Sequence, residues 1–177
     1  MSDEDVEGNN LDQNVSHRLD RVPNTATERT VEGRPSREEI IDWWQERFGI
    51  PPETFEGHTF WEKGAGKIWA YAGNLDSPIE AESLGMSVLR TRQEHWKPTT
   101  EAAQRWGEEA TRNVIVLDRE RARRFVAGED QEIEWDGDWG YLIVAHEFAG
   151  GRAPLGVGLY LHGELRSQIP KGRRREI

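Results

Sequence analysis

The sequence predicts an α+β protein in which a small N-terminal α/β unit precedes a C-terminal β-barrel with one or two helices. Residues 36–110 alternate amphipathic helical segments with short aromatic β-type segments, whereas from residue 111 one strand and one helix are followed by four strands. Residues 1–35 show neither the helical nor the strand period. We therefore expect a disordered acidic leader (1–35), an α/β unit (36–110) and a barrel with a basic tail (111–177).

The first predicted helix begins after Ser36. Ser36 and Glu39 have the spacing of a capping box, in which the serine hydroxyl accepts from the backbone N–H of Glu39 and the glutamate reaches back. Gly49 is placed to end the helix in the left-handed conformation. The apolar residues between them recur at helical spacing: Ile40, Ile41, Trp43, Trp44 and Phe48.

Three β-type segments and a second helix complete the N-terminal unit. Residues 58–61 and 67–71 are predicted to form a hairpin, because Gly64 to Gly66 supply the positive φ angles of a tight turn. Residues 86–90 are a further predicted strand. Pro98 and the threonines that follow it are typical of a helix entrance, so a helix is expected through Trp106.

The C-terminal part begins with the β-branched run Val114–Leu117, a predicted strand. Asp118 is expected to cap a helix over 119–127 that Gly128 ends. Residues 131–135 and 139–146 are predicted to be two strands joined as a hairpin by Asp136-Gly-Asp138. A second strand pair, 155–160 and 164–169, is expected around His162-Gly163.

The composition narrows the function classes. Acidic residues number 33 against 23 basic ones, and the formal charge is −10. This acidic, lysine-poor balance resembles the protein surfaces of salt-loving archaea. A net negative charge ordinarily counts against nucleic-acid binding, but at about 1 M salt the Debye length is about 3 Å, so that local charge matters more than the total.

The sequence lacks the residues needed for several kinds of disulfide, metal and catalytic site. Cysteine is absent, which leaves no disulfide, thiolate metal site or cysteine nucleophile. The five histidines show no metal-ligand spacing, and no serine stands in a nucleophile motif, so we assign no catalytic and no metal-binding residue and expect no cofactor. No apolar run reaches the length of a membrane span and the start lacks a secretion signal, which predicts a cytoplasmic protein.

One resemblance covers about half of the chain. It begins at Leu84-Gly-Met-Ser-Val-Leu-Arg90 and Lys97-Pro-Thr-Thr100, and continues through Gly140-Tyr141, Pro154-Leu-Gly-Val-Gly158 and Pro170-Lys-Gly-Arg-Arg174. In this order and spacing the segments resemble the PUA-like RNA-binding C-terminal domain of the Sun/Fmu family of RNA cytosine-5 methyltransferases. Those enzymes need a cysteine to attack the pyrimidine, and this sequence has none. The chain resembles this PUA-like C-terminal domain standing alone without the catalytic domain, with residues 36–110 as a pre-PUA-like unit.

The resemblance implies a non-catalytic protein that binds structured ribosomal or transfer RNA in RNA modification, maturation or ribosome assembly. Phosphate contacts are expected from the basic tail, whose guanidinium groups bind phosphates and stack on bases. The strand 156–160 is the expected RNA-facing surface, because Gly156 and Gly158 expose backbone on one face; alternatively, both glycines serve a barrel bend or dense packing. The predicted RNA-binding residues of these two segments are Gly156, Gly158, Tyr160, Arg166, Lys171, Arg173, Arg174 and Arg175.

A second basic cluster surrounds Trp96. Interleaved cations and an aromatic ring suit single-stranded RNA, although Trp96 alternatively fixes the junction of the two halves. Its predicted RNA-binding residues are Arg90, Arg92 and Lys97, beside His95.

Two alternative functions stay open. The chain is alternatively an accessory subunit of a separate RNA methyltransferase, which it would contact through Trp61 and Trp69. It is alternatively a small-ligand-binding or hydrolytic PUA-like protein, in which Trp135, Trp139 and Tyr141 would gather around a modified base or a methylated cation.

Overall fold

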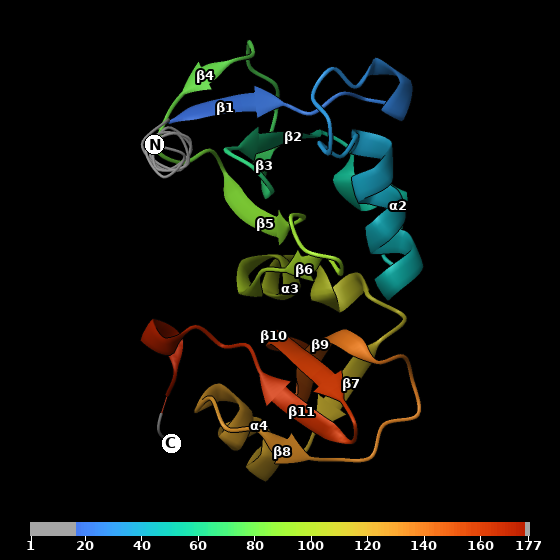
Figure 1. Ribbon diagram of the computed structural model, residues 1–177. Helices are drawn as coiled ribbons and strands as arrows, with labels where there is room; N and C mark the ends of the chain where they lie inside the picture. The colour runs from blue at the N-terminus through green and yellow to red at the C-terminus, as the bar shows by residue number, and fades with distance from the viewer. Residues whose placement is uncertain (1–16, 176–177) are drawn as a thin grey trace, which may run out of the picture. The chain divides into compact units, whose positions relative to one another are not determined.

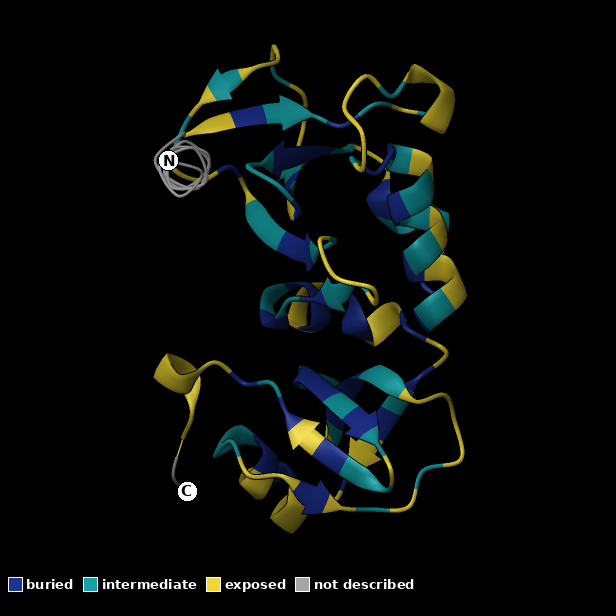
Figure 2. Cartoon of the chain, in the orientation of Figure 1, coloured by how far each residue is buried: buried dark blue, intermediate teal, exposed yellow. Residues whose placement is uncertain are grey.

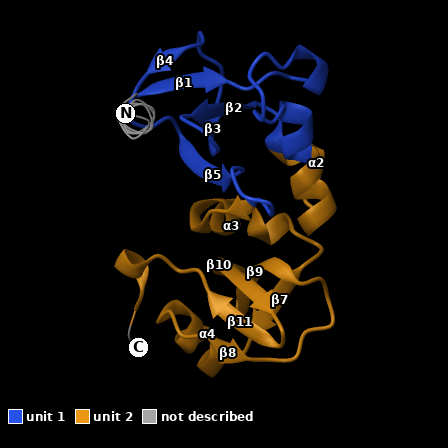
Figure 3. Ribbon diagram, in the orientation of Figure 1, with its two compact units in different colours: residues 1–41, 55–96 blue, residues 42–54, 97–177 orange. Residues whose placement is uncertain are grey.

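The computed structural model describes residues 17–175 (Figure 1). The chain forms two compact units: unit 1 comprises residues 1–41 and 55–96, and unit 2 comprises residues 42–54 and 97–177 (Figure 3). Both units are mainly β-sheet, as predicted for an α+β protein. No helix within the described part of the chain is long and apolar enough to cross a membrane.

Unit 1 is built on antiparallel strands. They lie in the order β4 (Ile79–Glu80), β1 (Arg18–Arg21), β2 (His58–Lys63), β3 (Lys67–Ala72) and β5 (Met86–Arg90). The predicted hairpin is confirmed, since β2 and β3 pair around Gly64 and Gly66, both with positive φ. A short 3₁₀ turn, η1 (Ala26–Glu28), follows β1.

Strand β1 corrects the predicted leader. Residues 18–21 were expected to be disordered, but they pair with β2 and β4, and Leu19 is fully buried against Trp61 and Leu84. A four-residue strand with one apolar side chain is too short to show a period, and its stability comes from these tertiary contacts. The leader prediction was therefore wrong for the described residues 17–35; residues 1–16 lie outside the described residues.

Helix α2 (Arg37–Phe48) begins at the predicted capping box. Glu39 N–H donates to Ser36 Oγ at 3.1 Å and Ser36 N–H donates to Glu39 Oε1 at 3.0 Å. Burial opposes ionisation of Glu39, but the hydrogen bonds from Ser36 and the charge of Arg29 outweigh it and lower the pKa of Glu39. Gly49 follows the helix with φ of 66°, as predicted, and η2 (Pro52–Phe55) comes next.

The contribution of the capping box to the free energy of unfolding can be measured. Ser36→Ala should lower the free energy of unfolding by about 1 kcal/mol at pH 7, because the N–H of Glu39 loses its acceptor. Since the pKa of Glu39 is lowered by folding, its contribution is present above the unfolded value of about 4.3 and is lost as the pH falls through the folded value. The Ser36 hydroxyl also hydrogen-bonds the Glu39 carboxylate and helps to lower its pKa, so part of the deficit should disappear when that carboxylate is protonated. Urea unfolding at pH 7 and pH 3 should show a smaller deficit at pH 3; an equal deficit at both would contradict the role of Glu39.

Unit 2 holds a curled sheet with the strand order β7-β9-β10-β11-β8 (Figure 1). Its strands are β7 (Val114–Leu117), β8 (Gln131–Glu132), β9 (Gly140–Phe148), β10 (Gly151–Leu161) and β11 (Glu164–Ser167). β7 runs parallel to β9, the other pairs are antiparallel, and a register shift between Pro154 and Gly156 interrupts the β9–β10 ladder. The predicted order of strand, helix and four strands is confirmed.

The other elements of unit 2 are β6 (Lys97–Pro98), α3 (Thr100–Trp106), η3 (Gly107–Glu109), α4 (Arg119–Val126) and η4 (Lys171–Arg173). Thr99 and Asp118 cap α3 and α4, as predicted. α4 and the strands of this sheet share one apolar core, and Figure 2 shows the buried stretches of the strands in dark blue. Its buried members are Ile115, Leu117, Ala122, Phe125, Leu142, Val144, Tyr160, Leu165 and Ile169.

One predicted hairpin is wrong. Residues 131–135 do not pair with 139–146: β8 is confined to Gln131–Glu132 and pairs with β11, whereas β9 pairs with β7 and β10. The intervening loop satisfies its polar groups locally, because the Trp135 indole N–H donates to the carbonyl of Asp138 at 2.9 Å.

The units also divide the chain differently from the predicted boundary at residues 110 and 111. Helix α3 and residues 42–54 belong to unit 2. The Gln104 side chain donates to the carbonyl of Leu155 at 3.0 Å, and the rings of Trp44 and Trp106 meet edge to face at 5.4 Å. These contacts join segments that are far apart in the sequence. They leave no local sequence signal, so the boundary between the units could not be predicted from it.

Candidate nucleic-acid interface

Helix α4 presents arginines on its exposed side. Ala122 and Phe125 are buried at a spacing of three, so the helix has one narrow apolar stripe. The helix also carries four arginines, all of them exposed: Arg119, Arg121, Arg123 and Arg124. The sequence analysis missed these residues, although the run Arg119-Glu-Arg-Ala-Arg-Arg124 is itself a signal of local positive charge.

The C-terminal tail runs beside the end of this helix. The backbone N–H of Arg175 donates to the carbonyl of Val126 at 2.9 Å. Arg174 Nε donates to the carbonyl of Ile169 at 3.2 Å, and a Cβ at Gly128 would lie only 2.3 Å from that nitrogen. Gly128 has φ of 90° and no side chain, which lets the tail approach the helix closely.

The tail contacts the end of α4, and we call the exposed cations of helix and tail, taken together, the arginine surface. Two of its residues form ion pairs that are exposed to solvent: Arg124 with Glu120 at 3.1 Å and Arg173 with Glu101 at 2.7 Å. Exposed pairs of this kind contribute little and exchange readily with other anions. The surface consists of Arg119, Arg121, Arg123, Arg124, Lys171, Arg173, Arg174 and Arg175, all exposed.

The two glycines of the predicted RNA-facing strand are not available to a ligand. Gly156 and Gly158 are buried, and a Cβ at either would lie 2.7 Å from Ile169 Cδ1 or 2.6 Å from Leu165 Cδ1. Tyr160 is 3% exposed, and its hydroxyl donates to the carbonyl of Ile133 at 2.8 Å. The prediction for the two glycines was wrong: they allow dense packing, which was the alternative interpretation. For Tyr160, which lines the hollow described below, RNA contact stays a prediction.

The other predicted cations lie outside the arginine surface. Arg166 is exposed on β11 and donates to Glu164 at 2.7 Å. Lys97 Nζ donates to Gln168 at 3.0 Å and lies 5.9 Å from the centre of the Tyr141 ring. Arg90 is half-buried and Arg92 is exposed, both in unit 1. The structure therefore brings together the tail cations with α4, and the RNA contacts of all these residues stay predictions.

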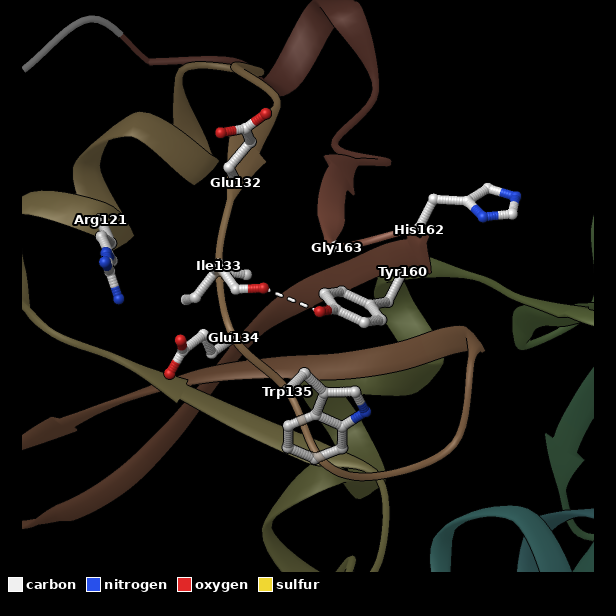
Figure 4. Close-up of a pocket in the computed structure, with 8 residues that line it drawn as sticks. All are labelled: Arg121, Glu132, Ile133, Glu134, Trp135, Tyr160, His162 and Gly163. Atoms are coloured by element: carbon white, nitrogen blue, oxygen red, sulfur yellow. Dashed lines mark hydrogen bonds between the residues drawn. The ribbon is translucent and has the colours of Figure 1, made fainter.

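An open hollow of about 900 Å³ begins at the N-terminal part of α4 (Figure 4). Arg121 contributes to its wall from the helix, Tyr160 comes from β10, and His162 and Gly163 come from the turn before β11. The remaining lining residues are consecutive, from the last residue of β8 into the loop that follows: Glu132, Ile133, Glu134 and Trp135.

The three proposed cage aromatics do not share this hollow. Trp135 lines it, whereas Trp139 and Tyr141 are not among its lining residues. Trp139 is 54% exposed and meets the edge of His162 at 4.8 Å. The accessory-subunit hypothesis also loses one contact, because Trp61 is fully buried; Trp69 is partly buried.

The loop that ends in Trp139 is held by buried polar groups. The Asn113 side chain, 6% exposed and with φ of 55°, donates to Asp138 at 3.0 Å and accepts from its N–H at 3.3 Å. Arg47 donates to the carbonyl of Trp139 at 3.1 Å. Burial lowers the pKa of Arg47, while Asp138 opposes the shift. Within residues 17–175 no group of acidic and histidine side chains is arranged to hold a metal ion.

The curled sheet, helix α4 and the basic tail give the C-terminal part of unit 2 a PUA-like fold. Residues 112–175 match the family model described as "Methyltransferase RsmF PUA domain". This confirms the resemblance to the PUA-like domain of Sun/Fmu-type methyltransferases. Residues 1–85 match a second model, described as a family of unknown function (DUF7122).

A curated relative extends the similarity over most of the chain. The Ribosomal RNA small subunit methyltransferase F of Aeromonas salmonicida (strain A449) is 26% identical over 143 residues, which is 79% of this chain. The match covers 27% of the relative, so the chain spans about a quarter of that protein's length.

Proposed function

We propose that this chain binds structured RNA through the arginine surface and does not itself catalyse a reaction. The observation that carries the proposal is the union of α4 and the tail, which places eight exposed cations on a PUA-like domain similar to that of an rRNA methyltransferase. Ribosomal RNA is the favoured target, with transfer RNA as the second, in modification, maturation or ribosome assembly.

Physical chemistry supports phosphate as the group that this surface recognises. Guanidinium groups bind phosphate oxygens with two parallel hydrogen bonds, and seven of the eight cations are arginine. Two acidic side chains pair with the surface, and both pairs are exposed, so an incoming phosphate replaces them at low cost. Helix and tail carry eight exposed cations, with Glu120, Glu129 and Asp130 exposed beside them, within a chain whose formal charge is −10.

The residue inventory supports a non-catalytic role. Pyrimidine C5 methylation of the kind implied by the family resemblance requires a cysteine nucleophile, and the sequence contains no cysteine. RNA recognition without chemistry is the activity for which residues are present.

The proposal is tested by crosslinking the tagged full chain to RNA in cells at native salt, sequencing the recovered RNA and identifying copurified proteins by mass spectrometry. Enrichment of a discrete rRNA or tRNA site is the expected result. Recovery of an RNA methyltransferase with little direct crosslinking would instead support the accessory subunit. Recovery of neither would overturn the proposal.

A further inference from the structure

The arginine surface and the open hollow share one residue. Arg121 belongs to α4 and also lines the hollow, so the basic surface continues directly into it. We propose that the hollow receives one unpaired RNA base that carries an amino group, while its flanking phosphates lie on the α4 arginines. This inference rests on the proposed RNA binding and adds a site with base preference.

The lining of the hollow suits a base better than a phosphate. Trp135 and Ile133 offer apolar and aromatic surface, and the Tyr160 hydroxyl is already committed to the Ile133 carbonyl at 2.8 Å (Figure 4). Stacking on an aromatic side chain contributes about 1 to 3 kcal/mol per base. The volume of about 900 Å³ accommodates a nucleoside.

Two carboxylates give the hollow its selectivity. Glu132 and Glu134 line it, and Figure 4 shows Arg121 and His162 on opposite sides of the segment that carries them. Carboxylates repel phosphates but accept hydrogen bonds from exocyclic amino groups, as with cytosine N4. Arg121 can hold a flanking phosphate at the entrance. Cytosine, adenine and guanine therefore fit the hollow, whereas uracil lacks an amino group.

The rim of the hollow is organised before any ligand binds. His162, which lines it, meets the half-exposed Trp139 at 4.8 Å, and the loop before Trp139 is fixed by Asn113 and Arg47. The backbone N–H of Ile133 donates to the carbonyl of Gly163 at 3.0 Å, which ties the lining segment to the opposite turn. A site held in this way loses little conformational entropy on binding.

The experiment compares RNA hairpins that differ at a single bulged nucleotide. The full chain is titrated with one stem that carries a bulged cytosine, a bulged uracil or no bulge. We expect about tenfold tighter binding of the cytosine bulge than of the uracil bulge, the scale of one base-edge contact. The double variant Glu132→Gln, Glu134→Gln should lose this preference while still binding the stem. The matched control is Glu108→Gln, Glu147→Gln, which removes two exposed carboxylates of unit 2 outside the hollow.

Each outcome either supports or overturns the proposed base site. A cytosine preference that disappears in the double variant and persists in the control supports the base site. Equal binding of all three hairpins overturns the base site and leaves the proposed function standing, as does a preference that survives in the double variant. Failure to bind any hairpin or a recovered native RNA overturns the proposed function and the base site together.

Discussion

Replacing Arg119, Arg123, Lys171 and Arg175 by glutamine should weaken RNA binding about a hundredfold at physiological salt. All four are exposed members of the arginine surface, and no ion pair within the described residues engages their side chains. Each lost phosphate contact is expected to cost roughly 0.7 kcal/mol, within the range for exposed charge pairs. Glutamine removes the charge and keeps a polar side chain at four exposed positions, so the fold should be unaffected.

Salt dependence separates this loss from a change in folding. The slope of log K against log salt should become shallower by about three, because each phosphate contact contributes about 0.7 to 0.9 to it. The matched control replaces four exposed cations outside the surface by glutamine: Arg18, Lys67, Arg105 and Arg112. An equal loss in the control would show that net charge, and not the arginine surface, determines binding.

Phe125→Ala should destabilise unit 2 by about 3 to 5 kcal/mol, the range for emptying a large buried aromatic site. Its ring is fully buried in the core of the sheet. Its carbonyl accepts from the Ser167 hydroxyl at 2.8 Å, at the point where β11 leads into the tail. Loss of the ring removes the main apolar anchor of α4, so the arginine surface should lose its arrangement as well.

Urea unfolding monitored by hydrogen exchange of unit 2 amides measures this effect. The control is Phe148→Ala, because Phe148 is 57% exposed and should cost less than about 0.5 kcal/mol. Similar effects of the two substitutions would contradict the assignment of Phe125 to the core. We expect Phe125→Ala, but not Phe148→Ala, to reduce RNA binding, because the arginines of α4 would be displaced.

The acidic composition and the basic surface are compatible for a physical reason. At high ionic strength the long-range repulsion between RNA and a net negative protein is screened within a few ångströms. Contacts made by guanidinium groups directly on phosphates are screened less than distant charges. The arrangement of the eight cations therefore matters more than the charge of −10 for the whole chain.

Most of the elements could be predicted from the sequence because their signals are local. The capping pair Ser36 and Glu39, the turn glycines of the β2–β3 hairpin and the cap Asp118 each act within a few residues. The order of elements in the curled sheet of unit 2 follows from the same kind of signal. The tail cations were also visible as a run of like charges.

Tertiary structure alone decided where those elements meet. Leu19 became part of a strand because β2 and β4 flank it, and Gly156 and Gly158 became buried because Ile169 and Leu165 pack on them. Pairing partners and burial depend on residues far away in the chain, and a sequence period cannot express them. The same holds for the candidate site: the sequence by itself determined a PUA-like, arginine-rich protein without cysteine, and the approach of the tail to α4 decided that its cations form one surface.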